Sequence, residues 1–152
     1  MPDVSSFDDI RDEFERRVRK TVWAQVATVD TAGRPRNRIL HPLWEGTTGW
    51  IATVPQTLKA KHLARNNHVS LGYIDAMEPV YVEATAAWVD SVDEKRRVWE
   101  YIKSFPEPYG YDPGAIGVWD SPEGENFGLL KLTPSRIEVS AAGGEGKVWR
   151  AT

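Results

Sequence analysis

The sequence predicts a mainly β domain of the α+β class, in which six to seven antiparallel strands roll into a small barrel with a few helices at its periphery. Apolar and polar residues alternate in several short segments, these segments meet through short turns such as Asp30–Gly33 and Glu45–Gly49, and only three segments show helical periodicity. Strands and helices do not alternate as in a parallel α/β sheet, and no Gly-rich dinucleotide fingerprint is present, so a Rossmann domain is not expected. With 152 residues, the chain is expected to form a single domain over residues 1–152.

The N-terminal segment, residues 1–21, is predicted to contain an amphipathic helix from about Ser6 to Thr21. Acidic residues lie near the start of this helix and basic residues near its end, as the helix dipole favours. Its apolar positions step by three and four along the chain and form one buried stripe: Phe7, Ile10, Phe14, Val18 and Val22.

From Trp23 onward the period changes to two, which predicts a series of strands. The first strand ends at Asp30, and the others cover Pro35–Leu43, Trp50–Val54, Val69–Asp75, Val80–Val89 and a last pair, Gly128–Leu132 and Arg136–Ser140. A helix is expected over about Asp93–Ser104, because Ser91 and Glu94 form a capping box at its start. The segment Pro106–Gly114 is too rich in Pro and Gly for regular structure, and residues 141–152 form a C-terminal tail.

The composition excludes several classes of protein. A formal charge of −3 argues against a general nucleic-acid binder. No apolar run approaches the roughly 20 residues of a membrane span, and the N-terminus is acidic where a signal peptide is basic, so a soluble, cytoplasmic protein is expected. The absence of cysteine excludes disulfides, thiolate nucleophiles and cysteine metal sites, and the three histidines lack the spacing of metal ligands, so no metal site is expected.

Aromatic residues in loops are candidates for covering a ligand. The chain has seven tryptophans, and Trp44, Trp119 and Trp149 lie in or near predicted loops and strand ends, where a flat ring covers a ligand or a partner subunit. Tyr109 and Tyr111, in the Pro-rich segment, either frame a pocket or anchor a packed loop.

The helix predicted over about Leu58–Asn66 has cations at its N-terminal end. Lys59, Lys61 and His62 lie in its first turn or just beyond, with no acid nearby, although helix N-termini carry partial positive charge and favour acids. A hydroxyl cap at Thr57 together with added lysines is typical of a phosphate or carboxylate site.

Two arginines on the second strand point to the same chemistry. Arg36 and Arg38 are two residues apart, so their side chains are neighbours on one face of the strand, and they repel unless an anion joins them. The alternative is a solvated face on which the arginines pair with acids elsewhere. Short turns between neighbouring strands favour a common site with Lys59 and Lys61, in which Arg contacts a phosphate or carboxylate with two donors and Lys adds a point charge.

An ordered set of motifs resembles a known family. The runs Arg36-Asn-Arg38-Ile-Leu-His-Pro42, Trp50-Ile-Ala-Thr53 and Thr57-Leu-Lys59-Ala-Lys-His-Leu63 occur in that order. Over about residues 22–90 the chain is similar to the flavin-binding split β-barrel proteins related to pyridoxamine 5′-phosphate oxidase, including members that bind a deazaflavin in place of FMN.

The resemblance implies a split barrel and a homodimer with two cofactor sites at the subunit interface. The implied cofactor is FMN or, alternatively, the deazaflavin coenzyme F-420. Phosphate contacts are implied for Arg38, Thr57 and Lys59, with Arg36 and Lys61 nearby. The ring would be lined by residues 39–42 and 50–53, with the following cofactor-binding candidates among them: Ile39, His41, Pro42 and Thr53.

The tail departs from the family pattern. True vitamin B6 oxidases resemble one another in a C-terminal Arg-x-His that handles the substrate phosphate, whereas this chain has Lys147-Val-Trp-Arg150. Pyridoxamine phosphate is therefore not the expected substrate. Trp149 and Arg150 either reach over the partner's cofactor or form a docked tail.

The expected function is an oxidoreductase in which a bound flavin or deazaflavin transfers hydride to or from a small organic substrate. This hypothesis requires no catalytic side chain, and no Gly-x-Ser-x-Gly nucleophile elbow is present. His41 is either a proton donor near the cofactor or a packed histidine. One alternative function is a cofactor carrier or stress-related protein without turnover, and another is a haem-binding or haem-degrading protein on the same barrel, for which no histidine stands out as an axial ligand.

Overall fold

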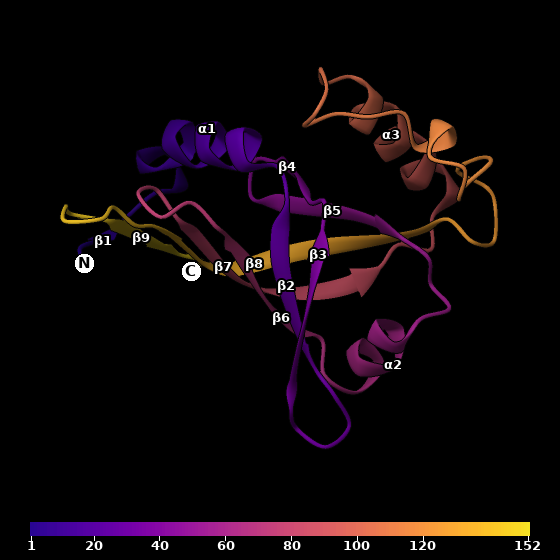
Figure 1. Ribbon diagram of the computed structural model, residues 1–152, viewed down its shortest axis with the longest axis horizontal. Coiled ribbons are helices and arrows are strands. Elements are labelled where there is room, and N and C mark those ends of the chain that lie inside the picture. Colours follow the sequence, from indigo (N-terminus) through magenta and orange to yellow (C-terminus); the bar gives the residue numbers. More distant parts are fainter.

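The computed structural model describes residues 1–152 as nine strands, three α-helices and two short 3-10 helices (Figure 1). The strands are β1 (Asp3–Val4), β2 (Ala24–Val29), β3 (Pro35–Leu40), β4 (Leu43–Glu45), β5 (Thr48–Thr53), β6 (His68–Tyr73), β7 (Val80–Trp88), β8 (Gly128–Val139) and β9 (Lys147–Arg150). The helices are η1 (Phe7–Asp9), α1 (Arg11–Thr21), α2 (Leu58–Arg65), α3 (Val92–Lys103) and η2 (Pro113–Ala115).

All strands belong to one curved sheet that does not close on itself. Its order is β1-β9-β8-β7-β6-β2-β3, and β5 pairs with both β8 and β4 off this path. β3 pairs only with β2, so a seam remains between β3 and β5 where a closed barrel would have a ladder. This arrangement confirms the mainly β split barrel with peripheral helices.

The sheet is larger than the six to seven strands expected, and it is mixed. The additional strands β1, β4 and β9 have only two to four residues, too few for a visible alternation of apolar and polar side chains. β1 runs parallel to β9, whereas all other pairs are antiparallel. The C-terminal tail therefore contributes a strand to the sheet.

The pair of strands expected at Gly128–Leu132 and Arg136–Ser140 is wrong, because β8 continues from Gly128 to Val139 without a turn. β8 pairs with β5 over Gly128–Leu132 and with β9 over Arg136–Val139. Pro134 lies between these two stretches, next to a register shift of the β7–β8 pair: Ala84 pairs with Pro134 and Glu83 with Arg136, so Ser135 of β8 is left without a partner in β7.

Two hydrophobic clusters form the core. The larger lies between the sheet and α1, which contributes Phe14 and Val18, and the smaller surrounds the buried side of α3, which contributes Val98 and Ile102. α1 and α3 lie on the same side of the sheet, whereas α2 lies apart from them beside the long β2–β3 ribbon (Figure 1). None of the helices combines the length and the hydropathy that crossing a membrane requires.

Two of the tryptophans considered for covering a ligand are buried in this core, and one of them, Trp119, also lines a hollow at the surface. Trp44 is 2% exposed and donates from its ring N–H to the hydroxyl of Tyr73 at 2.8 Å. Trp119 is 8% exposed, packs edge-on against Phe127 and donates to the Asn126 carbonyl. Their neighbours in sequence suggested loops, but their side chains point into the protein.

Candidate functional site

A basic groove lies between β3, the β2–β3 turn and the start of α2. It has a volume of about 780 Å³ and is lined by Asp30, Thr31, Arg34, Arg36, Asn37, Arg38, Thr57, Leu58, Lys59 and His62. The structure thus brings the three implied phosphate ligands, Arg38, Thr57 and Lys59, and the further cofactor-binding candidate Arg36 to one place.

The cations of the basic groove differ in their partners. Asp30, whose side chain is buried, accepts hydrogen bonds from the side chains of Arg34 at 3.0 Å and Arg36 at 3.2 Å. The backbone N–H of Arg34 is the main reason that the pKa of Asp30 lies far below its ordinary value, so the carboxylate stays charged. Arg36 therefore pairs with an acid, which is the alternative to anion binding that the sequence left open for the two strand arginines.

Arg38 and Lys59 make no ion pair. The guanidinium of Arg38 donates to the backbone carbonyl of Val26 at 3.2 Å, and the Lys59 ammonium donates to the hydroxyl of Thr57 at 3.2 Å. Burial lowers the pKa of both side chains, and the positive charge of Arg38 lowers the pKa of Lys59 further. Two partly buried cations that repel each other form a site that an anion stabilises.

The N-terminus of α2 opens onto this pair of cations. Thr57 is the N-cap residue with extended backbone, as predicted, but its hydroxyl caps no backbone N–H and accepts the hydrogen bond from Lys59 instead. The first turn of α2 contains no acid. The unpaired N–H groups and the dipole of the helix therefore add to the positive potential.

Lys61 lies on a different side of α2. It is exposed and lines a separate hollow with Pro55, Gln56 and Ala64. Lys59 and Lys61 are only two residues apart, and positions so spaced in a helix do not share a face. The structure does not bring Lys61 into the basic groove.

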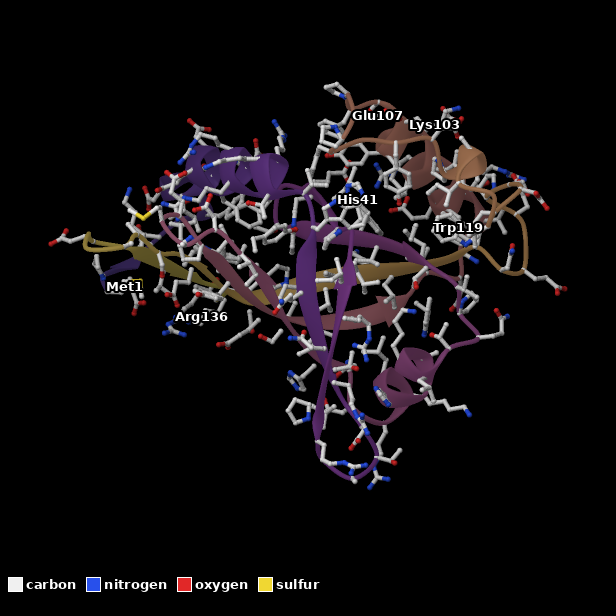
Figure 2. The ribbon with its side chains drawn as sticks, viewed as in Figure 1. Met1, His41, Lys103, Glu107, Trp119 and Arg136 are labelled. Atoms are coloured by element: carbon white, nitrogen blue, oxygen red, sulfur yellow. The ribbon has the colours of Figure 1, made fainter.

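An apolar hollow of about 400 Å³ lies at the seam between β3 and β5. It is lined by Trp23, Ile39, Leu40, His41, Ala52, Glu107, Pro108, Gly110, Tyr111, Ile116 and Trp119. β3 thus serves both sites, with Arg36 and Arg38 at the basic groove and Ile39 and Leu40 at the apolar hollow, where His41 follows directly after the strand. Figure 2 shows His41 and Trp119 on the side of the sheet where the loop with Glu107 lies.

His41 is held in one tautomer. Its Nε2 lies 2.7 Å from the backbone oxygen of Tyr109, and because a carbonyl only accepts, Nε2 carries the proton. Its ring is flanked by those of Trp23 at 4.9 Å and Tyr111 at 4.8 Å between centroids. Burial lowers the pKa of His41, so the side chain is neutral near pH 7 and its only N–H is already donated. This environment is that of a packed histidine and disfavours a proton donor.

The loop after α3 is a fixed wall of the apolar hollow. The hydroxyl of Tyr109 accepts a hydrogen bond from the backbone N–H of Trp44 at 2.8 Å, and the N–H of Gly110 donates to the carbonyl of Pro106 at 2.9 Å. A Cβ atom on Gly110 would lie 2.0 Å from the carbonyl oxygen of Phe105, so only glycine fits there. Of the two tyrosines, Tyr109 anchors the loop and Tyr111 lines the hollow.

The family model described as pyridoxamine 5′-phosphate oxidase matches residues 10–141 of the chain. The chain belongs to the pyridoxamine 5′-phosphate oxidase family. None of the curated protein sequences matches this one significantly.

Several solved structures superpose on the chain. A Clostridium acetobutylicum protein related to general stress protein 26 of B. subtilis has a TM-score of 0.75 at 15% identity, over 94% of this chain and 95% of that one. A pyridoxamine 5′-phosphate oxidase-related, FMN-binding protein from Nostoc punctiforme has a TM-score of 0.66 at 18% identity, over 98% of both chains. An F420 reductase has a TM-score of 0.60 at 16% identity, over 81% of this chain and 94% of that one. At these identities the similarity shows the shared fold.

Three further residues that the family resemblance singled out, Pro42, Thr53 and Trp149, line neither the basic groove nor the apolar hollow. Pro42 is buried directly after β3, and Thr53 is buried at the end of β5, opposite Gly128 of β8. Trp149 lies on β9 and packs edge-on against Phe7 at 5.6 Å, so within one chain the tail is docked. β9 is at the other end of the sheet from α2 (Figure 1).

Sequence reasoning missed Trp23, Glu107 and Ile116 in the apolar hollow. Trp23 is 55% exposed because Val22 adopts φ 70° and ψ −61°, a γ-turn that a β-branched residue rarely adopts. Such a turn has no sequence signal, since glycine or asparagine normally marks a positive φ. Glu107 and Ile116 come from a loop whose path is set by tertiary hydrogen bonds, as described for Tyr109 and Gly110.

Proposed function

We propose that this chain binds a flavin or deazaflavin nucleotide and acts as an oxidoreductase, with hydride transfer between the cofactor and a small organic substrate. The observation that carries the proposal is the pair Arg38 and Lys59, two partly buried cations without an acidic partner at the N-terminus of α2. A cofactor phosphate is the anion that such a pair accommodates.

The position of the apolar hollow supports a ligand with a charged end and a flat end. Because a strand rises about 3.3 Å per residue, the backbone positions of Arg38 and His41 on and just after β3 are about 10 Å apart. A phosphate at the basic groove and a ring at the seam beside residues 39–42 would therefore be served by one strand. The Nostoc FMN-binding protein and the F420 reductase with this fold are consistent with either cofactor.

In this proposal the side chains bind and orient rather than react. Arg38, Lys59 and the α2 N–H groups hold the phosphate, and the aromatic residues of the apolar hollow exclude water. The bound ring supplies the hydride chemistry. His41 fixes the loop through Tyr109 and has no free proton to give.

We further propose a homodimer in which the partner subunit covers the seam. Ile39 is 57% exposed and Ile116 is 51% exposed, beside the exposed ring of Trp23, and an apolar rim of this kind favours coverage. Pyridoxamine phosphate is not the proposed substrate, because the tail has no Arg-x-His and the apolar hollow has no cation for a second phosphate.

The proposal is tested by titrating the purified, unloaded protein with FMN, riboflavin and coenzyme F-420, with ligand fluorescence as the readout. FMN or F-420 should bind, riboflavin should bind more weakly because it lacks the phosphate, and raised salt should remove most of this difference. Failure of both phosphorylated cofactors to bind would refute the proposal.

A carrier without turnover is distinguished by a second experiment. The loaded cofactor is reduced, and its reoxidation by quinones, unsaturated ketones or dioxygen is compared with that of the free cofactor. An oxidoreductase reoxidises its cofactor faster with at least one acceptor, whereas a carrier protects the reduced ring from all of them.

A further inference from the structure

His62 lies on α2 about one turn after Lys59, and its side chain lines the basic groove. Residues three apart in a helix share a face, so the imidazole lies on the side of α2 that carries Lys59. α2 packs against β2 (Figure 1), and the Nδ1 atom of His62 lies 2.9 Å from the hydroxyl oxygen of Thr28 on that strand. One ring nitrogen is therefore engaged with the sheet while the ring itself borders the groove.

The burial of Thr28 decides which ring nitrogen of His62 carries the proton. Thr28 is 2% exposed, and its hydroxyl has no hydrogen-bond partner in the protein other than Nδ1. If Nδ1 carried the ring proton, the hydroxyl proton would be buried without an acceptor, which is the costly way to bury a hydroxyl. In the neutral ring the hydroxyl therefore donates to Nδ1, and the proton is on Nε2.

The Nε2–H group of His62 is free to serve the basic groove. It donates to no protein atom, and the buried side-chain nitrogens without a partner are those of Arg17 and Trp50, so Nε2 is accessible. In this respect His62 differs from His41, whose Nε2–H is already donated to the backbone oxygen of Tyr109. His62 thus offers an aimed, unused donor.

A neutral N–H complements the two cations of the basic groove. Arg38 and Lys59 already place two positive charges there, and a third would add to their mutual repulsion. The Nε2–H of a neutral His62 adds a directed hydrogen bond to an anionic oxygen without adding a charge. Hydrogen bonds to charged acceptors are stronger than those between neutral groups, so one such donor has a measurable effect on affinity.

We propose that His62 is a further phosphate ligand, through its Nε2–H, and that Thr28 is a positioning residue that fixes the tautomer and orientation of the imidazole. This inference rests on the proposed function, which puts the cofactor phosphate in the basic groove. Thr28 and His62 then act as a unit, because the hydroxyl influences the phosphate only through the ring.

The first test reads the tautomer from the chemical shifts of the ring nitrogens in the unloaded protein at about pH 8, where imidazole is neutral. The signals of His62 are identified by their loss in His62→Gln. Nδ1 should have the shift of a bare nitrogen and Nε2 that of a protonated one, and inorganic phosphate or FMN should move the Nε2 signal. A proton on Nδ1 would overturn the inference.

The second test is a double-mutant cycle on cofactor affinity. His62→Ala should raise the Kd for FMN about 10-fold and leave the Kd for riboflavin unchanged, because the lost bond is to the phosphate. Thr28→Val keeps the shape of the side chain and should raise the Kd for FMN about 2- to 5-fold, but not further in the His62→Ala background. Equal effects of Thr28→Val in both backgrounds would show that Thr28 does not act through His62 and would overturn its positioning role.

His68→Ala and Thr85→Val are the matched controls, because His68 on β6 and Thr85 on β7 do not line the basic groove. Neither control should change the Kd for FMN. Equal losses in His62→Ala and His68→Ala, or no loss in His62→Ala, would overturn the ligand role of His62. If neither FMN nor F-420 binds, the proposed function fails, and the Nε2 signal still decides this inference, since no response to inorganic phosphate would overturn it.

Discussion

Replacing Lys59 by alanine separates a ligand site from a structural cluster of charges. A charge-assisted hydrogen bond to phosphate contributes about 1.5–3 kcal/mol, and tenfold in affinity corresponds to about 1.4 kcal/mol, so the Kd for FMN should rise about 10- to 150-fold. In the unloaded protein the change should not lower the free energy of unfolding, because Lys59 is partly buried, has no acidic partner and is repelled by Arg38. Lys59→Ala should thus weaken FMN binding without lowering the free energy of unfolding of the unloaded protein.

The assay is fluorescence titration of FMN and riboflavin, together with urea denaturation of the unloaded protein. Lys61→Ala is the matched control, since it removes the same charge from the same helix but faces a separate hollow. The Kd for riboflavin should be unchanged in both variants, because riboflavin has no phosphate. Equal effects of Lys59→Ala and Lys61→Ala on FMN would refute the assignment, and so would weakened riboflavin binding in the Lys59 variant.

Three other perturbations follow from the packing and the ion pairs. Gly110→Ala should lower the free energy of unfolding by about 1–3 kcal/mol in urea denaturation, because the new Cβ would overlap the carbonyl of Phe105, and a stability equal to that of the unaltered protein would contradict this contact. The hydrogen bond with Arg16 is the main reason that the pKa of Glu78 is lowered from 4.5 to about 2. A lowered folded-state pKa means that the stabilisation is present above pH 4.5 and is lost as the pH falls towards 2, so Tm should decline over this window and decline less in Glu78→Gln. Removal of residues 147–152 deletes β9 and leaves β1 without its partner, so thermal denaturation should show a lower Tm, whereas an unchanged Tm would mean that the tail strand adds no stability.

Much of the fold follows from local patterns in the sequence. The long strands β2, β6 and β7 alternate in burial, as their residues predict, and α2 and α3 begin and end within one residue of their expected bounds. The first helix ends at Thr21 as expected, but α1 begins at Arg11 instead of Ser6, because Phe7–Asp9 form the separate 3-10 helix η1. Among the strands, the exception is β8, which was predicted as two strands but is continuous through Pro134. Tolerance of that proline depends on which strands lie beside it, and strand neighbours are a tertiary property that no local pattern contains.

The basic part of the candidate site could be predicted from the positions of charged residues in the sequence. Lys59 and Arg38 were singled out because like charges at a helix N-terminus and on one strand face need an anion, and the structure brings them into one groove. Lys61 lies near the same helix N-terminus and carries the same charge, but it faces a separate hollow because positions two residues apart in a helix do not share a face. Of the apolar hollow, the sequence indicated residues 39–41 and Ala52 but not Trp23, which is placed by a strained turn, or the path of the opposite wall, which depends on hydrogen bonds across the molecule.

The position of β8 also bears on how the protein is synthesised. β5 ends at Thr53, but its partner β8 begins only at Gly128, and β8 also pairs with β7 and β9. As the chain leaves the ribosome from its N-terminus, about half of the polypeptide is synthesised between the end of β5 and the start of β8, and the ladder between them cannot form before then. Such long-range pairing makes folding slow relative to helical proteins of similar size. The nascent chain therefore exposes an unpaired edge of β5 for about half of its synthesis, and this is the stage at which it is most prone to aggregation.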